Sequence, residues 1–163
     1  MQYTNKDVRR QNRLLNKETA VTLLDTGEYG VLSMQAEDGG AYGIPISYVW
    51  DGEQNIYLHC ALEGRKIRLL HKCNQVSFCV VGKTNVIPNQ FTTEYQSVIL
   101  DCEASIKIET DEKIKALKLL IKKYSPNDIE LGDEYIKKSF EHTEVIKLSV
   151  KEWSGKSKAA KNS

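Results

Sequence analysis

The chain has 163 residues, of which 40% are hydrophobic and 28% are charged, and its formal net charge is +1. This length suits a single domain with a substantial core. The small net charge and the dispersed lysines argue against a surface built for nucleic acid. No run of about 20 apolar residues is available to cross a membrane.

The cysteine pattern indicates the redox environment that we expect for the protein. Its four cysteines, Cys60, Cys73, Cys79 and Cys102, form no CxxC pair and no regular framework. No signal-peptide pattern precedes them. We therefore expect reduced thiols in a cytoplasmic protein.

The first 25 residues are predicted to be helical, in two segments. Val8, Leu14 and Leu15 belong to the first segment. The second segment covers residues 19–25, and Asn16 is a suitable N-cap for it.

A β-hairpin is predicted next, from strands at residues 29–34 and 41–50. The Asp-Gly pair at 38–39 supplies the positive φ values that tight hairpin turns need. Pro45 lies inside the second strand and favours an edge position or a bulge there.

The middle of the chain is predicted to contain three more strands and one helix. The strands cover residues 55–60, 75–82 and 97–109, and the helix covers residues 63–72. A loop that contains Pro88 separates the last two strands.

The C-terminal part is predicted to contain two helices and a strand. Residues 111–124 have the apolar spacing of an amphipathic helix. A short helix at 134–140 and a final strand at 144–150 follow.

These elements predict a mainly β (α+β) fold, an antiparallel six-stranded barrel with peripheral helices. The domain is expected to cover residues 1–155, followed by a lysine-rich tail at 156–163. The lysines at this end of the chain are Lys151, Lys156, Lys158 and Lys161. Such a cluster is more typical of a solvated terminus than of a binding arm.

The start of the helix after the third strand is the most informative local feature. Arg65 and Lys66 open this helix directly after Gly64. Cations are disfavoured at a helix N-terminus by about 0.3–1 kcal/mol each. The pair is either ordinary surface charge, or part of an anion site made by free N–H groups, a glycine and two cations.

Other chemistry has little support in the sequence. His59 and Cys60 are neighbours in a strand and therefore point to opposite faces. His71 and His142 have no partner at ligand spacing, so we expect no metal site. The GxSxG, P-loop and GxGxxG motifs are absent.

Five segments taken in order make the sequence similar to a known family. They are GEYGVLS (27–33), DGGAYGIPISYVWD (38–51), IYLHCALEGRKIRLL (56–70), QVSFCVVGKTNVIPNQFTTEYQSVI (75–99) and EWSGKSK (152–158). The chain resembles the nitroimidazole-resistance (Nim) family, within the pyridoxamine 5′-phosphate oxidase-like, FMN-binding split-barrel superfamily. HCALEGRK and FTTEYQSV are the most specific stretches.

The resemblance implies a split β-barrel homodimer that binds FMN in clefts between its subunits. It implies that Arg65 and Lys66 hold the flavin phosphate, and that Gln96 and Ser97 reach the cleft from the partner subunit. The full set of expected cofactor-binding residues is Ile46, Ser47, Tyr48, His59, Cys60, Arg65, Lys66, Thr92, Gln96, Ser97 and Trp153. Dimerisation is expected to bury apolar strand residues, namely Val76, Phe78 and Val80.

The implied activity is that of an FMN-dependent oxidoreductase, which reduces small organic substrates, including nitroaromatics, with electrons from NAD(P)H. His59 is the candidate catalytic residue, as a proton donor or by stacking on the substrate. The second strand lacks the basic residue of the oxidase branch, and the chain lacks that branch's C-terminal arginine segment, so oxidation of pyridoxamine phosphate is not expected. The alternative is a non-catalytic flavin- or haem-binding protein with His59 and His142 as axial ligands.

Overall fold

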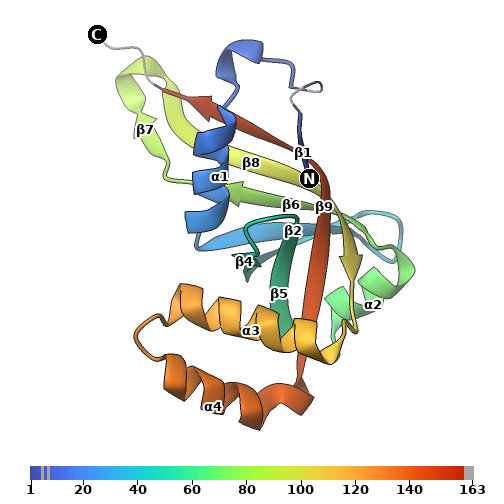
Figure 1. Cartoon of the computed structure of the whole chain (residues 1–163). Coiled ribbons are helices and arrows are strands. Elements are labelled where there is room, and N and C mark those ends of the chain that lie inside the picture. Colours follow the sequence, from blue (N-terminus) through green and yellow to red (C-terminus); the bar gives the residue numbers. More distant parts are fainter. Residues whose placement is uncertain (5, 7, 160–163) are drawn as a thin grey trace.

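The computed structural model describes residues 1–4, 6 and 8–159 (Figure 1). The helices are α1 (Lys17–Thr26), α2 (Arg65–Lys72), α3 (Thr110–Tyr124) and α4 (Ile129–Ser139). The strands are β1 (Gln2–Tyr3), β2 (Tyr29–Gln35), β3 (Ala41–Ser47), β4 (Val49–Trp50), β5 (Asn55–Ala61), β6 (Gln75–Val81), β7 (Asn85–Ile87), β8 (Thr92–Ser105) and β9 (Thr143–Lys158). Short 3₁₀ turns occur at Gln11–Arg13, Pro88–Gln90 and Phe140–His142.

The strands form one curved sheet in the order β3-β2-β6-β8-β9-β5-β4, with antiparallel neighbours throughout this path. β1 joins β9 in parallel, and β7 pairs with β8. The path does not close, because β3 and β4 lie at its two ends. The mainly β, antiparallel fold class is therefore confirmed. The expected number of strands is wrong, because the described residues form nine strands and not six.

The second strand of the predicted hairpin is split at Tyr48. β3 pairs with β2 from Ala41 to Ser47, and β4 pairs with β5 instead. Pro45 lies opposite Val31 on β3, which is an edge strand. The edge position predicted from this proline is confirmed, because an edge residue needs no second ladder bond.

The N-terminal helix prediction is half right. Asn16 caps α1, and its Oδ1 accepts the backbone N–H of Thr19 at 2.8 Å. The preceding residues are not an α-helix, because β1 pairs with β9 and places Tyr3 edge-on against Trp153, with ring centroids 4.8 Å apart. Tertiary pairing here overrides a weak local helix pattern.

The main core lies between the sheet and α1, which crosses one sheet face (Figure 1). Alternate residues of β2, β6 and β8 point into this core, as expected for strands with one buried face. The inward-facing residues of these three strands include Leu32, Met34, Val76, Phe78, Val80, Val98 and Leu100. The β2–β6–β8 part of the sheet therefore has a second face that this core does not cover.

The three apolar residues expected at a dimer surface are not on the outside of the sheet. Val76, Phe78 and Val80 lie in the main core of the chain and are 0–7% exposed. The exposed apolar residues of these strands alternate with them: Tyr29 is 58% exposed, Val81 53% and Ile99 48%. The period-2 geometry of a strand puts the two sets on opposite faces.

A second, smaller core joins α3 to the other end of the sheet. Val49, Tyr57, Leu117, Leu120 and Val145 are buried together there. α3 and α4 form an antiparallel pair at this end of the molecule (Figure 1).

α4 begins at Ile129, five residues before the predicted start. Gly132 lies in this first part of the helix, where a Cβ would come within 2.6 Å of the Ile121 side chain. The close approach of α3 and α4 therefore requires a glycine at this position. Because glycine has a low helix propensity, the sequence pattern does not predict a helix here.

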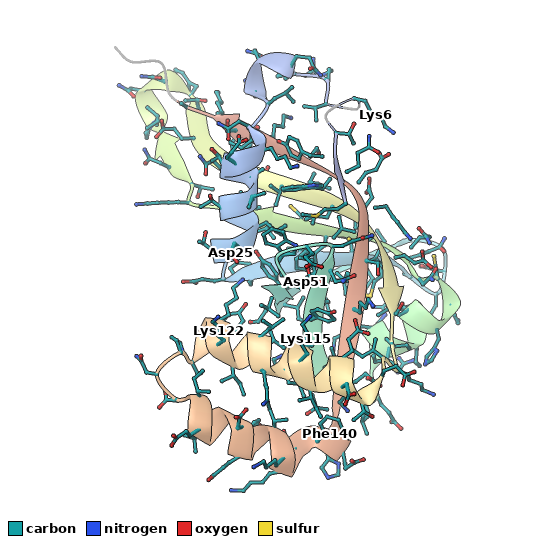
Figure 2. All side chains as sticks on the ribbon, viewed as in Figure 1. Lys6, Asp25, Asp51, Lys115, Lys122 and Phe140 are labelled. Carbon is teal, nitrogen blue, oxygen red and sulfur yellow. The ribbon has the colours of Figure 1, made fainter. Side chains whose placement is uncertain are left out.

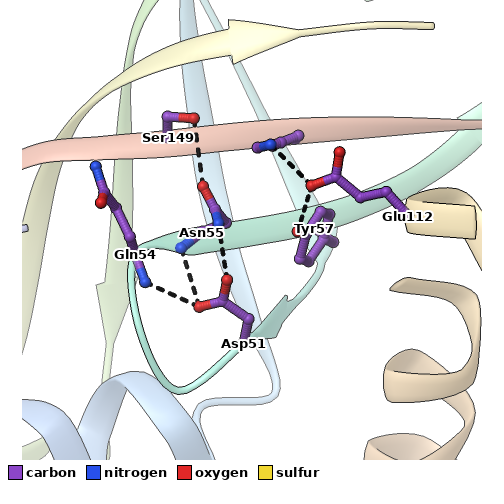
Figure 3. Close-up of polar contacts among 7 residues, drawn as sticks. Asp51, Gln54, Asn55, Tyr57, Glu112 and Ser149 are labelled. Atoms are coloured by element: carbon purple, nitrogen blue, oxygen red, sulfur yellow. Dashed lines mark hydrogen bonds and ion pairs between the residues drawn. The ribbon is translucent and has the colours of Figure 1, made fainter. Parts of the chain in front are cut away.

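Polar contacts fix α3 and the β4–β5 turn to the sheet (Figure 3). The Tyr57 hydroxyl donates to Oε1 of Glu112 at 2.7 Å, and Lys147 forms an ion pair with the same oxygen at 2.8 Å. Asp51 accepts backbone N–H groups of the turn that it begins, including that of Asn55 at 3.0 Å. α3 is thus attached to both β5 and β9.

β9 is longer than the predicted strand at 144–150, because it runs to Lys158. Lys156 and Lys158 of the expected tail are therefore part of the sheet, opposite Ser97 and Tyr95 of β8. Residues 160–163, including Lys161, lie outside the described residues. No described helix has the length and apolar character needed to cross a membrane.

Candidate functional site

The start of α2 is an uncapped helix N-terminus. Gly64 is the N-cap residue with φ of 143°, a conformation that glycine adopts readily and other residues avoid. No side chain of the described residues caps the helix, and its first turn contains no acid. The amide groups of Arg65, Lys66 and Ile67 are therefore available to an anion.

Arg65 is held by two residues of the β2–β3 hairpin. Its Nε and Nη2 lie 3.2 Å and 3.0 Å from Oε2 of Glu37. Its guanidinium carbon lies 4.1 Å from the centre of the Tyr42 ring. The Arg65 and Glu37 side chains are 46% and 39% exposed, so this cation remains accessible from solvent.

Lys66 interacts with the end of β5. Partial burial, together with the nearby charge of Lys66, lowers the pKa of His59 below its ordinary value. Burial raises the pKa of the Cys60 thiol, and Lys66 opposes that rise. Cys60 packs against the core whereas His59 is exposed, which confirms that the two residues face opposite sides of the strand.

The end of β3 is arranged differently from what the resemblance implies for Tyr48. Ile46 and Ser47 are partly exposed, but the Tyr48 ring is fully buried. The Tyr48 hydroxyl donates to the carbonyl oxygen of Leu24. Its backbone N–H donates to the hydroxyl of Tyr124 at 2.9 Å. The polar groups of Tyr48 are thus engaged within the fold.

Two adjoining depressions connect Ser47 to Gln96. One, of about 670 Å³, is lined by Ser47, Lys123 and Tyr124, and the other, of about 460 Å³, is lined by Gln96 and the end of β6. They share Thr26, Glu28 and Tyr29 along one border. Ser47 and Gln96, both expected at the cofactor, therefore line adjoining depressions of the same chain.

Lys123 is the unusual residue of the larger depression. Its Nζ is buried, has no hydrogen-bond partner among the described residues, and lies 3.9 Å from the centre of the Tyr48 ring. Burial lowers the pKa of Lys123 to about 8, partly offset by the charge of Asp25. Asp25 projects from the end of α1 towards the C-terminal end of α3 (Figure 2).

Three of the expected residues lie elsewhere. Ser97 and Trp153 border a depression of about 410 Å³ beneath the N-terminal segment. Trp153 is only 2% exposed, and its indole N–H has no partner among the described residues. Thr92 pairs with Ile87 next to the turn of the β7–β8 hairpin, where Lys158 donates to its hydroxyl.

The candidate residues therefore form two groups, one at the uncapped start of α2 and one along the groove at the far end of β3. The strand itself sets the separation between Tyr42 and Ser47, about 16 Å at a rise of 3.3 Å per residue. A ligand that contacted both ends would lie along β3. His59, Cys60 and Lys66 lie at the α2 end.

Sequence reasoning missed Glu37, Tyr42 and Lys123. No sequence pattern links Glu37 to an arginine 28 residues away. Lys123 had a detectable signal, because it follows Ala116 and Leu120 on the buried stripe of α3, where an apolar residue is expected.

An open, mainly antiparallel sheet with flanking helices defines the chain as a split-barrel-like α+β protein. The pyridoxamine 5′-phosphate oxidase family matches residues 16–157. The chain belongs to this family, which confirms the superfamily expected from the sequence segments. A comparison with curated proteins gives no match.

Solved structures with the same fold span most of the chain. A candidate 5-nitroimidazole antibiotic resistance protein from Bacteroides thetaiotaomicron has a TM-score of 0.72 and 16% identity, covering 89% of this chain and 86% of that one. An FAD-binding protein from Mesorhizobium loti has a TM-score of 0.65 and 17% identity, with coverages of 90% and 98%. An FAD- and haem-binding protein from Mycobacterium smegmatis has a TM-score of 0.69 and 18% identity, with coverages of 91% and 74%. At these identities the likeness concerns the fold.

Proposed function

We propose that this protein binds FMN and uses it to reduce small organic molecules, including nitroaromatic compounds, with electrons from NAD(P)H. The observation that carries this proposal is the start of α2, where free amide groups, Gly64 and two cations converge. These groups suit a phosphate, which prefers charge-assisted hydrogen bonds and a helix N-terminus. Family membership and the flavin-binding proteins of the same fold add support.

The residues present fit a phosphorylated flavin better than a metal ion or an unphosphorylated ring. Arg65 and Lys66 would hold the phosphate, and Ile46 and Ser47 would line the cofactor along β3. The flavin would supply the hydride and electron chemistry, and the protein would bind and orient it. His59 would face the bound molecules, and partial desolvation of its ring together with the charge of Lys66 lowers its pKa.

The proposal includes a homodimer with flavin at the subunit interface. The uncovered sheet face with Tyr29, Val81 and Ile99 is a suitable contact surface, since exposed apolar patches commonly mark association sites. Gln96 and Ser97 lie on β8, next to Val81 and Gly82, and would approach the partner's cofactor from there.

Spectroscopy on the purified protein tests first whether it binds the cofactor, then whether the flavin is reduced, and by which electron donor. We expect an absorption spectrum with flavin bands, or saturable quenching of fluorescence when FMN is added. Anaerobic addition of NADH or NADPH should then bleach the flavin. A protein that leaves FMN fluorescence unchanged at all concentrations contradicts the proposal.

A non-catalytic flavin- or haem-binding protein is the second candidate. His59 and His142 lie at the same end of the β5–β9 pair, since Ala61 is opposite Thr143. Both histidines are exposed. A Soret band after haem addition that is lost in His59→Ala favours this function, and flavin bleaching by NAD(P)H contradicts it.

A further inference from the structure

The contact between Arg65 and the β2–β3 hairpin uses one edge of the guanidinium and leaves the other edge available to a ligand. Glu37 accepts from only one edge of the guanidinium, because Nε and Nη2 both point to the same oxygen, Oε2. A guanidinium has five N–H donors. Both Nη1 donors and one Nη2 donor therefore have no partner in the described part of the chain.

Tyr42 fixes the plane of the same group. Its ring lies 4.1 Å from the guanidinium carbon, and its side chain packs against the main core. A stacked arginine keeps its in-plane donors available while it loses freedom to rotate out of the plane. Glu37 and Tyr42 together therefore fix both the plane and the rotation of Arg65.

Glu37 is itself attached to an ordered turn. The N–H of Ala36 donates to the carbonyl of Gly40 at 2.8 Å, and the N–H of Gly39 donates to the carbonyl of Ala36 at 3.1 Å. Asp38 accepts the N–H of Gly40 at 3.0 Å. Hydrogen bonds from its own backbone and from Arg65 also hold the pKa of Glu37 below its ordinary value, so it is a carboxylate at neutral pH.

We infer that Glu37 and Tyr42 are positioning residues for phosphate recognition, and that they hold Arg65 with its free Nη1–Nη2 edge available to a phosphoryl group. This inference rests on the proposed function and names the residues that make the site selective for phosphorylated over unphosphorylated flavin. Arginine side chains lose considerable rotamer freedom on binding, so orienting one beforehand raises affinity.

Electrostatics and positioning predict opposite results when Glu37 is removed. If Glu37 were only a nearby negative charge, its loss would strengthen the binding of a phosphate dianion. If Glu37 positions Arg65, the loss of Glu37 weakens phosphate binding, even though a negative charge that repels the phosphate has been removed. The sign of the change therefore separates the two roles.

The experiment measures the dissociation constants of FMN and riboflavin by fluorescence titration for the native protein and four variants. Glu37→Ala should weaken FMN binding about threefold to tenfold and leave riboflavin binding unchanged. Glu37→Gln keeps an acceptor for Arg65 and should bind FMN as the native protein does, or more tightly. Tyr42→Phe keeps the stacking surface and should match the native protein.

Glu63→Ala is the matched control, because it removes an exposed carboxylate beside the same helix end. Among the described residues, the carboxylate that pairs with Arg65 is that of Glu37 and not that of Glu63. It should not weaken FMN binding. Unchanged or tighter FMN binding by Glu37→Ala overturns the inference, and so does equal weakening by Glu63→Ala. A native protein that binds neither flavin contradicts the proposed function and the inference with it, whereas flavin binding with an unmoved FMN-to-riboflavin ratio contradicts the inference alone.

Discussion

The Tyr124 hydroxyl joins the end of α3 to the backbone of Tyr48. It accepts the Tyr48 N–H at 2.9 Å, and it can donate to the carbonyl oxygen of Tyr48 at 2.8 Å or of Glu28 at 2.6 Å. These bonds satisfy backbone groups at the position where β3 ends and β4 begins. One side chain thus substitutes for the missing ladder bonds.

We predict that Tyr124→Phe lowers the free energy of unfolding by about 1–2 kcal/mol, because the Tyr48 N–H loses its acceptor in a partly buried site. Urea denaturation measures this change. Tyr135→Phe is the control, since Tyr135 is 70% exposed and should change stability by less than about 0.5 kcal/mol. Equal stability of the two variants would show that the Tyr124 bonds contribute nothing.

Lys123 should make stability depend on pH. Its pKa is about 8 in the folded protein and 10.5 ordinarily, so the unfolded chain binds more protons between these values. Below pH 8 Lys123 is protonated in both the folded and the unfolded chain, so it adds no pH dependence to the free energy of unfolding. Between pH 8 and 10.5 it is neutral only in the folded chain, so the free energy of unfolding rises with pH. We expect the native protein to gain about 1 kcal/mol relative to Lys123→Met between pH 7 and pH 9.5, after allowance for solvent screening. Urea denaturation at both pH values measures it.

Lys122→Met is the control for that experiment. Lys122 is exposed on the same helix, and its replacement should leave the pH dependence of the native protein unchanged. A native protein with the same slope as Lys123→Met would contradict the low pKa of Lys123.

Arg65→Ala should weaken FMN binding about tenfold or more, because a charge-assisted hydrogen bond contributes about 1.5–3 kcal/mol. Riboflavin, which has no phosphate, should bind to this variant as it does to the native protein. Lys72→Ala removes a cation from the other end of α2 and should have little effect. Isothermal titration calorimetry with both flavins distinguishes these outcomes, and equal losses for FMN and riboflavin would contradict a phosphate contact.

The uncovered sheet face should be a subunit interface. We expect the native protein to be a dimer by light scattering, and Val81→Asp to be a monomer, because a charge would be buried against an apolar surface. Leu131→Asp places the same charge on α4, where the replaced leucine is 66% exposed, and should remain a dimer. A monomeric native protein contradicts both the interface and the shared flavin cleft.

Gly30 and Gly43 provide a matched pair on neighbouring strands. A Cβ on Gly30 would lie 2.4 Å from the Phe78 ring, whereas the nearest atom to a Cβ on Gly43 would be 3.6 Å away. We expect Gly30→Ala to lose about 1–3 kcal/mol of stability through overpacking. Gly43→Ala should be close to neutral in thermal denaturation, and similar losses in both variants would indicate a backbone effect instead.

Local patterns predicted most elements of this fold, because hydrophobic periodicity and turn residues act over short distances. The β2–β3 hairpin, the Asn16 cap and the amphipathic α3 are examples. The errors arose where distant pairing decides the structure. β1 and the second half of β9 exist as strands because they pair with partners far away in the sequence, and neither carries a strong strand pattern of its own.

The candidate site was predictable to a similar extent. Arg65 and Lys66 were identified because charge at a helix start is a local signal. The partner of Arg65 was not, since Glu37 meets it only when the hairpin packs against α2. The inward direction of Tyr48 depends on where β3 ends, which strand propensity does not determine.

β9 has a consequence for how this chain can be assembled. It lies between β8 and β5, yet it is made of residues 143–158, near the end of the chain. During synthesis the β2–β6–β8 portion and the β4–β5 portion therefore emerge without the strand that joins them, and each leaves a sheet edge unpaired. Long-range pairing of this kind slows folding and exposes edges to association. We expect the slowest folding event to be the insertion of β9 between the two portions.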